Sequence, residues 1–111
     1  ENVKSFWRKE LEASIADAYA EQGEAMFVQQ RYEEAFTKWD AGAKLRPRHI
    51  KIEAGFLKLE VVANTMRTEA ELLMQQAKPG ACDRWRRITR MTRSDTETHL
   101  LGRRMANQVC N

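Results

Sequence analysis

The chain has 111 residues, a formal net charge of +3, 42% hydrophobic and 32% charged residues, and only five Gly and two Pro. This composition excludes a disordered segment, a collagen-like repeat and a turn-rich β fold, and it favours helices. A chain of this length can bury roughly two-thirds of the surface that its unfolded form exposes, which is enough for one core. The sequence therefore predicts a single all-α domain over residues 1–111 that folds without a metal.

No uncharged run approaches the ~20 apolar residues of a membrane span, and the N-terminal ENVKSFWRKE has no apolar signal-peptide core. We therefore expect no transmembrane segment in this chain. Because the sequence begins with Glu1 rather than Met, we expect a fragment or a processed form of a larger protein.

Residues 3–29 are expected to form a long first helix with one buried stripe. Its apolar residues recur mostly at three- and four-residue steps, the spacing of one helix face. QQR then interrupts the pattern, and a second, antiparallel helix runs to Pro47, because proline disfavours helical geometry at the residue before it. The stripe of the first helix consists of Phe6, Trp7, Leu11, Ile15, Ala18, Tyr19, Met26 and Phe27.

Residues 48–77 are expected to form a long third helix, because apolar residues alternate there at four- and three-residue steps. A dimeric coiled coil is one interpretation. Further apolar residues widen the face and favour a helix packed between two neighbours, so we expect a monomer or a weak dimer. The seam is Ile52, Phe56, Leu59, Ala63, Met66, Ala70, Leu73 and Ala77, and the residues that widen it are Leu57, Val61, Val62 and Leu72.

Residues 81–110 are expected to form a basic helical hairpin after the Pro79-Gly80 break. The first helix covers residues 81–92, and SDTE has the form of a capping box, with Ser94 and Glu97 starting a last helix over 95–109. The expected total is about five helices and no strands. The outer face of the hairpin carries Arg84, Arg86, Arg87, Arg90 and Arg93.

Helices approach closely only where small residues face each other and large aromatic residues fill the gaps beside them. Gly23 and Ala35 are the small residues here, and Tyr19, Tyr32 and Trp39 are the aromatic residues. The stretch 16–49 resembles a tetratricopeptide repeat, the 34-residue helix-turn-helix unit of α-solenoids, because it contains these residues together with RYEEA and Pro47. Gly42 takes the place of a usual alanine, and Gln22 and Met26 replace the usual leucine and tyrosine.

The resemblance implies antiparallel helical hairpins in a solenoid that binds a protein or peptide without catalysis. Ligands of this family lie against the inward face of each first helix, which here maps to Asp17, Ala20, Glu24, Phe27 and Val28. Ala20 and Glu24 stand where some members clamp a terminal carboxylate with Lys and Asn, so an acidic C-terminal peptide is not expected. Alternatively, Phe27 and Val28 pack against helix 48–77, and the domain is a spacer or assembly element.

A nucleic acid or an anionic surface is the second class of partner. Residues 82–111 hold seven arginines against three acidic residues, a balance of +4, whereas residues 1–81 sum to −1. Arginine can contact phosphates, but Trp85 lies on the apolar side of its helix, and an ordinary solvated helix face explains the charges as well. We therefore expect no nucleic-acid partner.

The remaining chemistry predicts a protein that is not an enzyme and holds no metal or cofactor. His49 and His99 have no partners at the spacing of a metal site or a catalytic triad, and no glycine-rich phosphate loop is present. Cys82 and Cys110 lie at the ends of the basic hairpin, so we expect a disulfide, although two free thiols in a reducing cytosol are the alternative. A bridge would favour an extracytoplasmic, periplasmic location.

Overall fold

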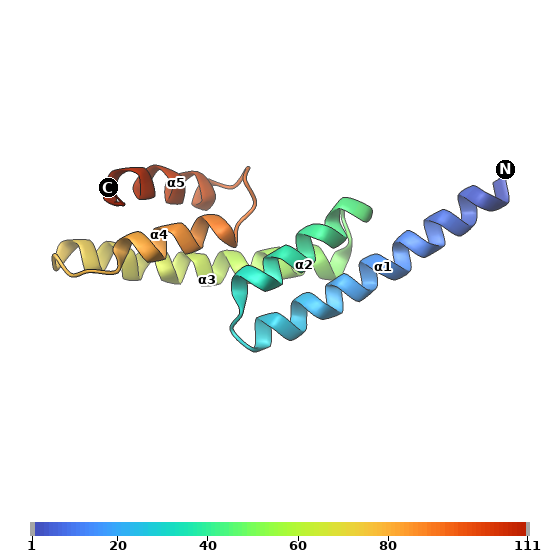
Figure 1. Cartoon of the computed structure of the whole chain (residues 1–111), viewed down its shortest axis with the longest axis horizontal. Coiled ribbons are helices and arrows are strands. Elements are labelled where there is room, and N and C mark those ends of the chain that lie inside the picture. Colours follow the sequence, from blue (N-terminus) through green and yellow to red (C-terminus); the bar gives the residue numbers. More distant parts are fainter. Residues whose placement is uncertain (1, 111) are drawn as a thin grey trace. The chain divides into compact units, whose positions relative to one another are not determined.

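The computed structural model describes the backbone of residues 2–110 and the side chains of residues 4–110. This range contains five α-helices and no strand, which confirms the all-α expectation. The helices are α1 (Asn2–Val28), α2 (Tyr32–Leu45), α3 (Ile50–Gln75), α4 (Ala81–Arg90) and α5 (Glu97–Val109) (Figure 1). Among the described residues, no helix is both long and apolar enough to span a bilayer.

The chain divides into two compact units, Glu1–Gly55 and Phe56–Asn111. Helix α3 contributes residues 50–55 to the first unit and residues 56–75 to the second. Each unit therefore combines one helical hairpin with a part of α3. That all 111 residues form one domain stays a prediction.

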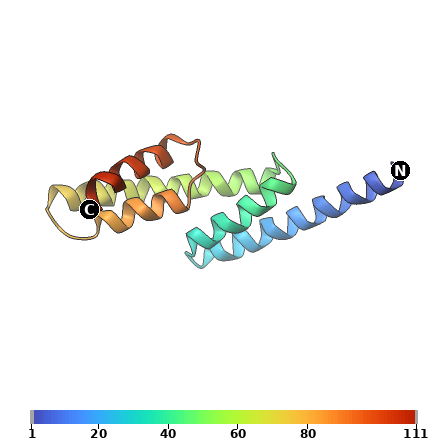
Figure 2. The same ribbon diagram turned by 45° about the horizontal axis from the view of Figure 1, so that its top comes forward.

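Helices α1 and α2 lie side by side and antiparallel in both views of the ribbon (Figures 1 and 2). The turn between them closes with two backbone hydrogen bonds, from Arg31 N to Met26 O (3.0 Å) and from Gln30 N to Phe27 O (2.9 Å). Gln30 takes the left-handed conformation, with φ of 63°, which is the usual way to end a helix and reverse the chain. The turn between α1 and α2 therefore lies at QQR, as predicted from the sequence.

Trp39 is the centre of the first unit. Its side chain is only 1% exposed, and its indole N–H donates to the carbonyl of Ala20 (3.0 Å). Two glycines lie against the ring: a Cβ on Gly55 would come within 2.6 Å of Trp39 Cδ2, and a Cβ on Gly23 would overlap the indole. Gly23, one of the two small residues expected at this helix pair, thus lies against Trp39, and the other, Ala35, is fully buried.

The expectation of one buried stripe along α1 is wrong for the N-terminal half of that helix. Phe6, Trp7, Leu11, Ile15 and Ala18 are exposed. One reason is that α1 has 27 residues and α2 has only 14, so α2 is too short to cover all of α1. The other reason is the direction in which these side chains point. Leu11 lies nine residues before the buried Ala20, which places the two about 180° apart at ~100° per residue.

Helix α3 is shorter than expected at both ends, running from Ile50 to Gln75 rather than over 48–77. Ala77 lies beyond the helix with φ of 52°, and Lys78 N donates to Leu73 O (2.9 Å), so Ala77 is an exposed part of the terminating turn. Leu73 is half-buried. The other six seam residues are buried as expected: Ile52, Phe56, Leu59, Ala63, Met66 and Ala70.

Of the four residues expected to bring α3 against a second neighbour, Val62 is half-buried and the other three are exposed. Leu57, Val61 and Leu72 are exposed, with 69%, 67% and 51% of their surfaces accessible. Val61 lies nine residues before the buried Ala70 and therefore points about 180° away from the core. The wide apolar pattern of α3 thus reflects two opposite faces.

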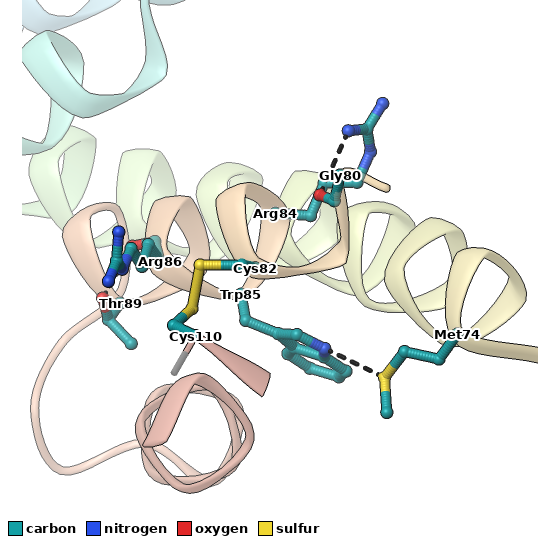
Figure 3. Close-up of a disulfide and its surroundings, with 8 residues drawn as sticks. All are labelled: Met74, Gly80, Cys82, Arg84, Trp85, Arg86, Thr89 and Cys110. Carbon is teal, nitrogen blue, oxygen red and sulfur yellow. Dashed lines mark hydrogen bonds between the residues drawn. A yellow bond between two sulfur atoms is a disulfide. The ribbon is translucent and has the colours of Figure 1, made fainter. Parts of the chain in front are cut away.

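The core of the second unit is built on Trp85, Ile88 and Met91, all fully buried. Trp85 Nε1 donates to Met74 Sδ (3.4 Å; Figure 3). Helix α5 crosses α4 closely at Gly102, where a Cβ would lie 3.0 Å from Ile88 Cγ2. As in the first unit, a glycine allows one helix backbone to approach the residues around a buried tryptophan.

The capping box expected at Ser94 is wrong, because α5 begins at Glu97 and its N-cap is Thr96. Thr96 Oγ1 accepts from His99 N (3.2 Å) and donates to Arg93 O (2.8 Å). The buried Thr92 donates to Ile88 O (2.6 Å), so its hydroxyl accepts from His99 Nδ1 (3.2 Å). The Thr96 cap therefore sets the helix start at Glu97, two residues after Asp95.

A disulfide joins Cys82 to Cys110, with the two Cα atoms 5.1 Å apart (Figure 3). Cys82 lies in the first turn of α4, and Cys110 is the C-cap of α5. The bridge forms because α5 ends at Val109 and Cys110 leaves helical geometry. It links the start of α4 to the end of α5 and so closes the hairpin.

The glycine contact of Trp39 gives a first prediction. Gly23→Ala should lower the free energy of unfolding by about 1–3 kcal/mol, because the new methyl group meets the indole, although alanine favours a helix interior by ~1 kcal/mol. Ser14→Ala, on the exposed part of α1, is the matched control and should be neutral or slightly stabilising. Urea unfolding followed by circular dichroism measures both; a Gly23→Ala protein as stable as the parent would contradict the packing.

The disulfide gives a second prediction. Replacing both cysteines with serine should lower the free energy of unfolding by roughly 3.6 kcal/mol in the loop-entropy model. Intact mass after alkylation, with and without reductant, shows whether the bridge is present in the purified protein. Two thiols that alkylate without reductant would contradict the bridge.

Candidate functional site

The loop before α3 is tied to the middle of α1 by His49. The His49 Nδ1 atom accepts from Ile52 N (3.4 Å), so Nε2 carries the proton and donates to Asp17 Oδ1 (2.6 Å). The His49 side chain is mostly buried, whereas the Asp17 side chain is mostly exposed. Asp17 therefore holds this loop at the surface of the first unit.

A hollow of about 580 Å³ opens beside the His49–Asp17 pair. Its walls carry charges of both signs, but more of the lining surface is apolar than polar, with Ile50 largely exposed at α3. Such a mixed lining suits a peptide segment that carries both charged and apolar side chains. The lining residues are Asp17 and Glu21 from α1, Arg46, Pro47, Arg48 and His49 from the loop, and Ile50 and Lys51 from α3.

The five residues assigned to partner binding by the repeat resemblance are not equally accessible. Asp17 and Glu24 are exposed on α1, and so is Val28. Ala20 is buried beneath Trp39. Phe27 is half-buried, with its ring centroid 5.3 Å from that of Tyr32 and 6.0 Å from that of Trp39. Partner binding by this set stays a prediction, with Asp17, Glu24 and Val28 as its accessible members.

Sequence reasoning missed a more prominent surface, the outer face of α1. We define this α1 outer face as Trp7, Leu11 and Ile15, which follow one another at steps of four residues. Trp7 is 65% exposed and packs edge-on against Phe6, with ring centroids 5.8 Å apart. A signal was available: the small residues Ala16, Ala20 and Gly23 occupy a different side of the helix from these apolar residues.

The expected basic surface is partly used within the second unit. Arg84 pairs with Glu69 (3.1 Å) and donates to Gly80 O (3.4 Å; Figure 3), and the Arg93 guanidinium lies 4.7 Å from the centroid of the Phe56 ring. Arg87 is half-buried, while Arg86 and Arg90 are exposed. Because Trp85 is buried, it offers no platform on which a base could stack.

The described residues contain no group of three or more His, Cys, Asp or Glu side chains placed to hold a metal ion. Both histidines take part in hydrogen bonds between a helix and a connecting segment: His49, before α3, bonds Asp17 of α1, and His99 of α5 bonds Thr92, which follows α4. Comparison with protein-family models gives no match, and neither do searches of curated proteins and of solved structures.

Proposed function

We propose that this chain is a non-catalytic protein-interaction module that binds a partner protein along α1. The observation that carries the proposal is the α1 outer face, where Trp7, Leu11 and Ile15 are exposed on about two and a half turns of helix, with the exposed Phe6 ring against Trp7. Contiguous exposed apolar residues mark interaction surfaces, and tryptophan is the residue type most enriched among those that dominate binding energy.

Charges beside the α1 outer face define the kind of partner. Arg8 lies along one edge, whereas Glu10, Asp17 and Glu21 follow the other. The complementary ligand is an amphipathic helix with an apolar seam, acidic on one side and basic on the other. It can extend from Trp7 to the mixed-charge hollow, which Asp17 and Glu21 also line.

A second copy of α1 fits this surface poorly. Antiparallel pairing centred on Trp7 and Leu11 would set Arg8 against Arg8 and Glu10 against Glu10 of the second copy. Like charges placed opposite one another disfavour that pairing. We therefore assign the α1 outer face to a different protein.

The tetratricopeptide-like interpretation of residues 16–49 belongs to the same proposal. The close approach at Gly23, the buried Ala35 and the enclosed Trp39 support it. A repeat of this type presents its helices to peptides or proteins. The Cys82–Cys110 bridge supports an oxidising, extracytoplasmic location for the module.

The third prediction tests this function by crosslinking followed by affinity measurement. A photo-activated benzoylphenylalanine at position 14, which is exposed next to the α1 outer face, should form a crosslink to the partner protein. The same group at position 29 is the control and should not crosslink that protein. Trp7→Ser should then weaken binding of that purified partner by roughly 30-fold or more, because the central aromatic anchor is lost.

Leu100→Ser is the matched control, because Leu100 is also an exposed aliphatic residue, at 54%, and lies on α5, outside the α1 outer face. It should leave the affinity within about twofold, and circular dichroism should show all variants folded. Unchanged affinity of Trp7→Ser for the crosslinked protein would overturn the assignment.

The alternative is an anionic ligand bound by Arg86 and Arg90 on α4. Two exposed arginines without a stacking aromatic give it less support than the α1 face has. Our fourth prediction is therefore no binding of single- or double-stranded DNA or RNA, or of anionic vesicles, at low salt, measured by fluorescence anisotropy and vesicle sedimentation. Binding that weakens steeply with salt and is lost in Arg86→Ala/Arg90→Ala would favour this alternative instead.

A further inference from the structure

The second unit carries an apolar face on α3 that no described part of that unit covers. We define the α3 outer face as Leu57, Val61, Asn64, Thr68 and Leu72, all exposed. Their steps of four, three, four and four residues keep them on one side of the helix. The buried residues of this part of α3 lie on the opposite side: Leu59, Ala63, Met66 and Ala70. The face is about 24 Å long at ~1.5 Å per residue.

The charged residues along the α3 outer face are spaced for self-recognition. Glu60 and Arg67 lie on one edge, two turns apart, and Lys58 and Thr65 lie on the other. A two-fold axis across the helix brings each edge against the same edge of a second copy. When the axis passes beside residues 62–63, Glu60 of each copy lies against Arg67 of the other copy, so the contact occurs twice. Lys58 of each copy lies beside Thr65 of the other copy.

The other arrangements of two α3 helices are less favourable. An antiparallel shift by one heptad places Glu60 against Glu60 and Lys58 against Lys58. A parallel pair places Glu60 opposite Thr65 and Arg67 opposite Leu72, so no ion pair forms between residues 56 and 75. Among these arrangements, only the first joins Glu60 to Arg67 without setting like charges against each other at these four edge positions.

That register also matches the side chains of the seam. Leu57 packs between Thr68 and Leu72 of the second copy, and Val61 packs against Asn64, so each large aliphatic residue meets a smaller or flexible one. Arg67 already binds Glu71 of its own helix (3.1 Å). Its guanidinium has five N–H donors and can serve both carboxylates.

We propose that the α3 outer face binds the α3 outer face of a second copy of this chain in an antiparallel, two-fold symmetric pair. The surface is separate from the α1 outer face. One short helix pair lies at the small end of specific interfaces, so the dimer is weak and reversible, with a dissociation constant on the order of 10 μM or above.

The fifth prediction uses charge reversal, tested on the full oxidised chain by sedimentation equilibrium from about 5 to 500 μM. The parent protein should dimerise over this range. Glu60→Arg and Arg67→Glu should each weaken dimerisation roughly tenfold or more, because each creates two like-charge contacts. An equimolar mixture of the two variants should associate again, since both contacts then join opposite charges.

Two controls keep the outcome clear. Circular dichroism and thermal unfolding must show both variants folded, and Trp7→Ser should dimerise as the parent does. A parent protein that is monomeric throughout the range would overturn the proposal. So would a mixture that stays monomeric, or a dimer that depends on Trp7 but not on Glu60 and Arg67.

Discussion

The packing of Trp39 against two glycines is the contact on which the first unit depends. Trp39 comes from α2, Gly23 from α1 and Gly55 from α3, so a single indole joins three helical segments. The ring can lie this close only because neither glycine has a Cβ, and its N–H is satisfied by the carbonyl of Ala20. Each glycine costs up to ~1 kcal/mol of helix stability, which the buried aromatic surface offsets.

The second unit repeats this arrangement on a smaller scale and adds a covalent bond. Trp85 is buried beside Gly102, and the Cys82–Cys110 bridge joins the outer ends of α4 and α5. The hairpin also draws on charges that the sequence places at its surface, because Arg84 binds Glu69 and Arg93 covers the Phe56 ring. A basic composition is thus a poor guide to a basic binding surface in this unit.

Two helices carry a second apolar face on the side away from their cores, and this feature underlies both proposals. A helix that needs only one buried face gains nothing in its own fold from Trp7 and Leu11 on α1, or from Leu57 and Val61 on α3. The charges beside the two faces separate their roles, since α1 opposes like charges in self-pairing and α3 does not. A dimer formed through α3 would carry two α1 outer faces and so bind a bivalent partner with avidity.

The sequence by itself determined the helices, their order and most of the buried seam of α3. Periodic apolar residues, QQR and Pro79-Gly80 are local signals, so the number of helices and the turns could be predicted from them. The pairing of Gly23 with Trp39 and of Cys82 with Cys110 was also predictable, because each lies in or between helices joined by a short connection.

Only the tertiary structure decided which apolar residues have a partner. Periodicity does not distinguish the core residues from Trp7, Leu11, Leu57 and Val61. It measures spacing along one helix and does not show how far the neighbouring helix extends. The start of α5 was likewise misplaced by the local pattern at Ser94, because Thr96 caps the helix and His99 also bonds Thr92. Accessibility is a property of neighbouring helices, and so the candidate sites became visible only once those neighbours were in place.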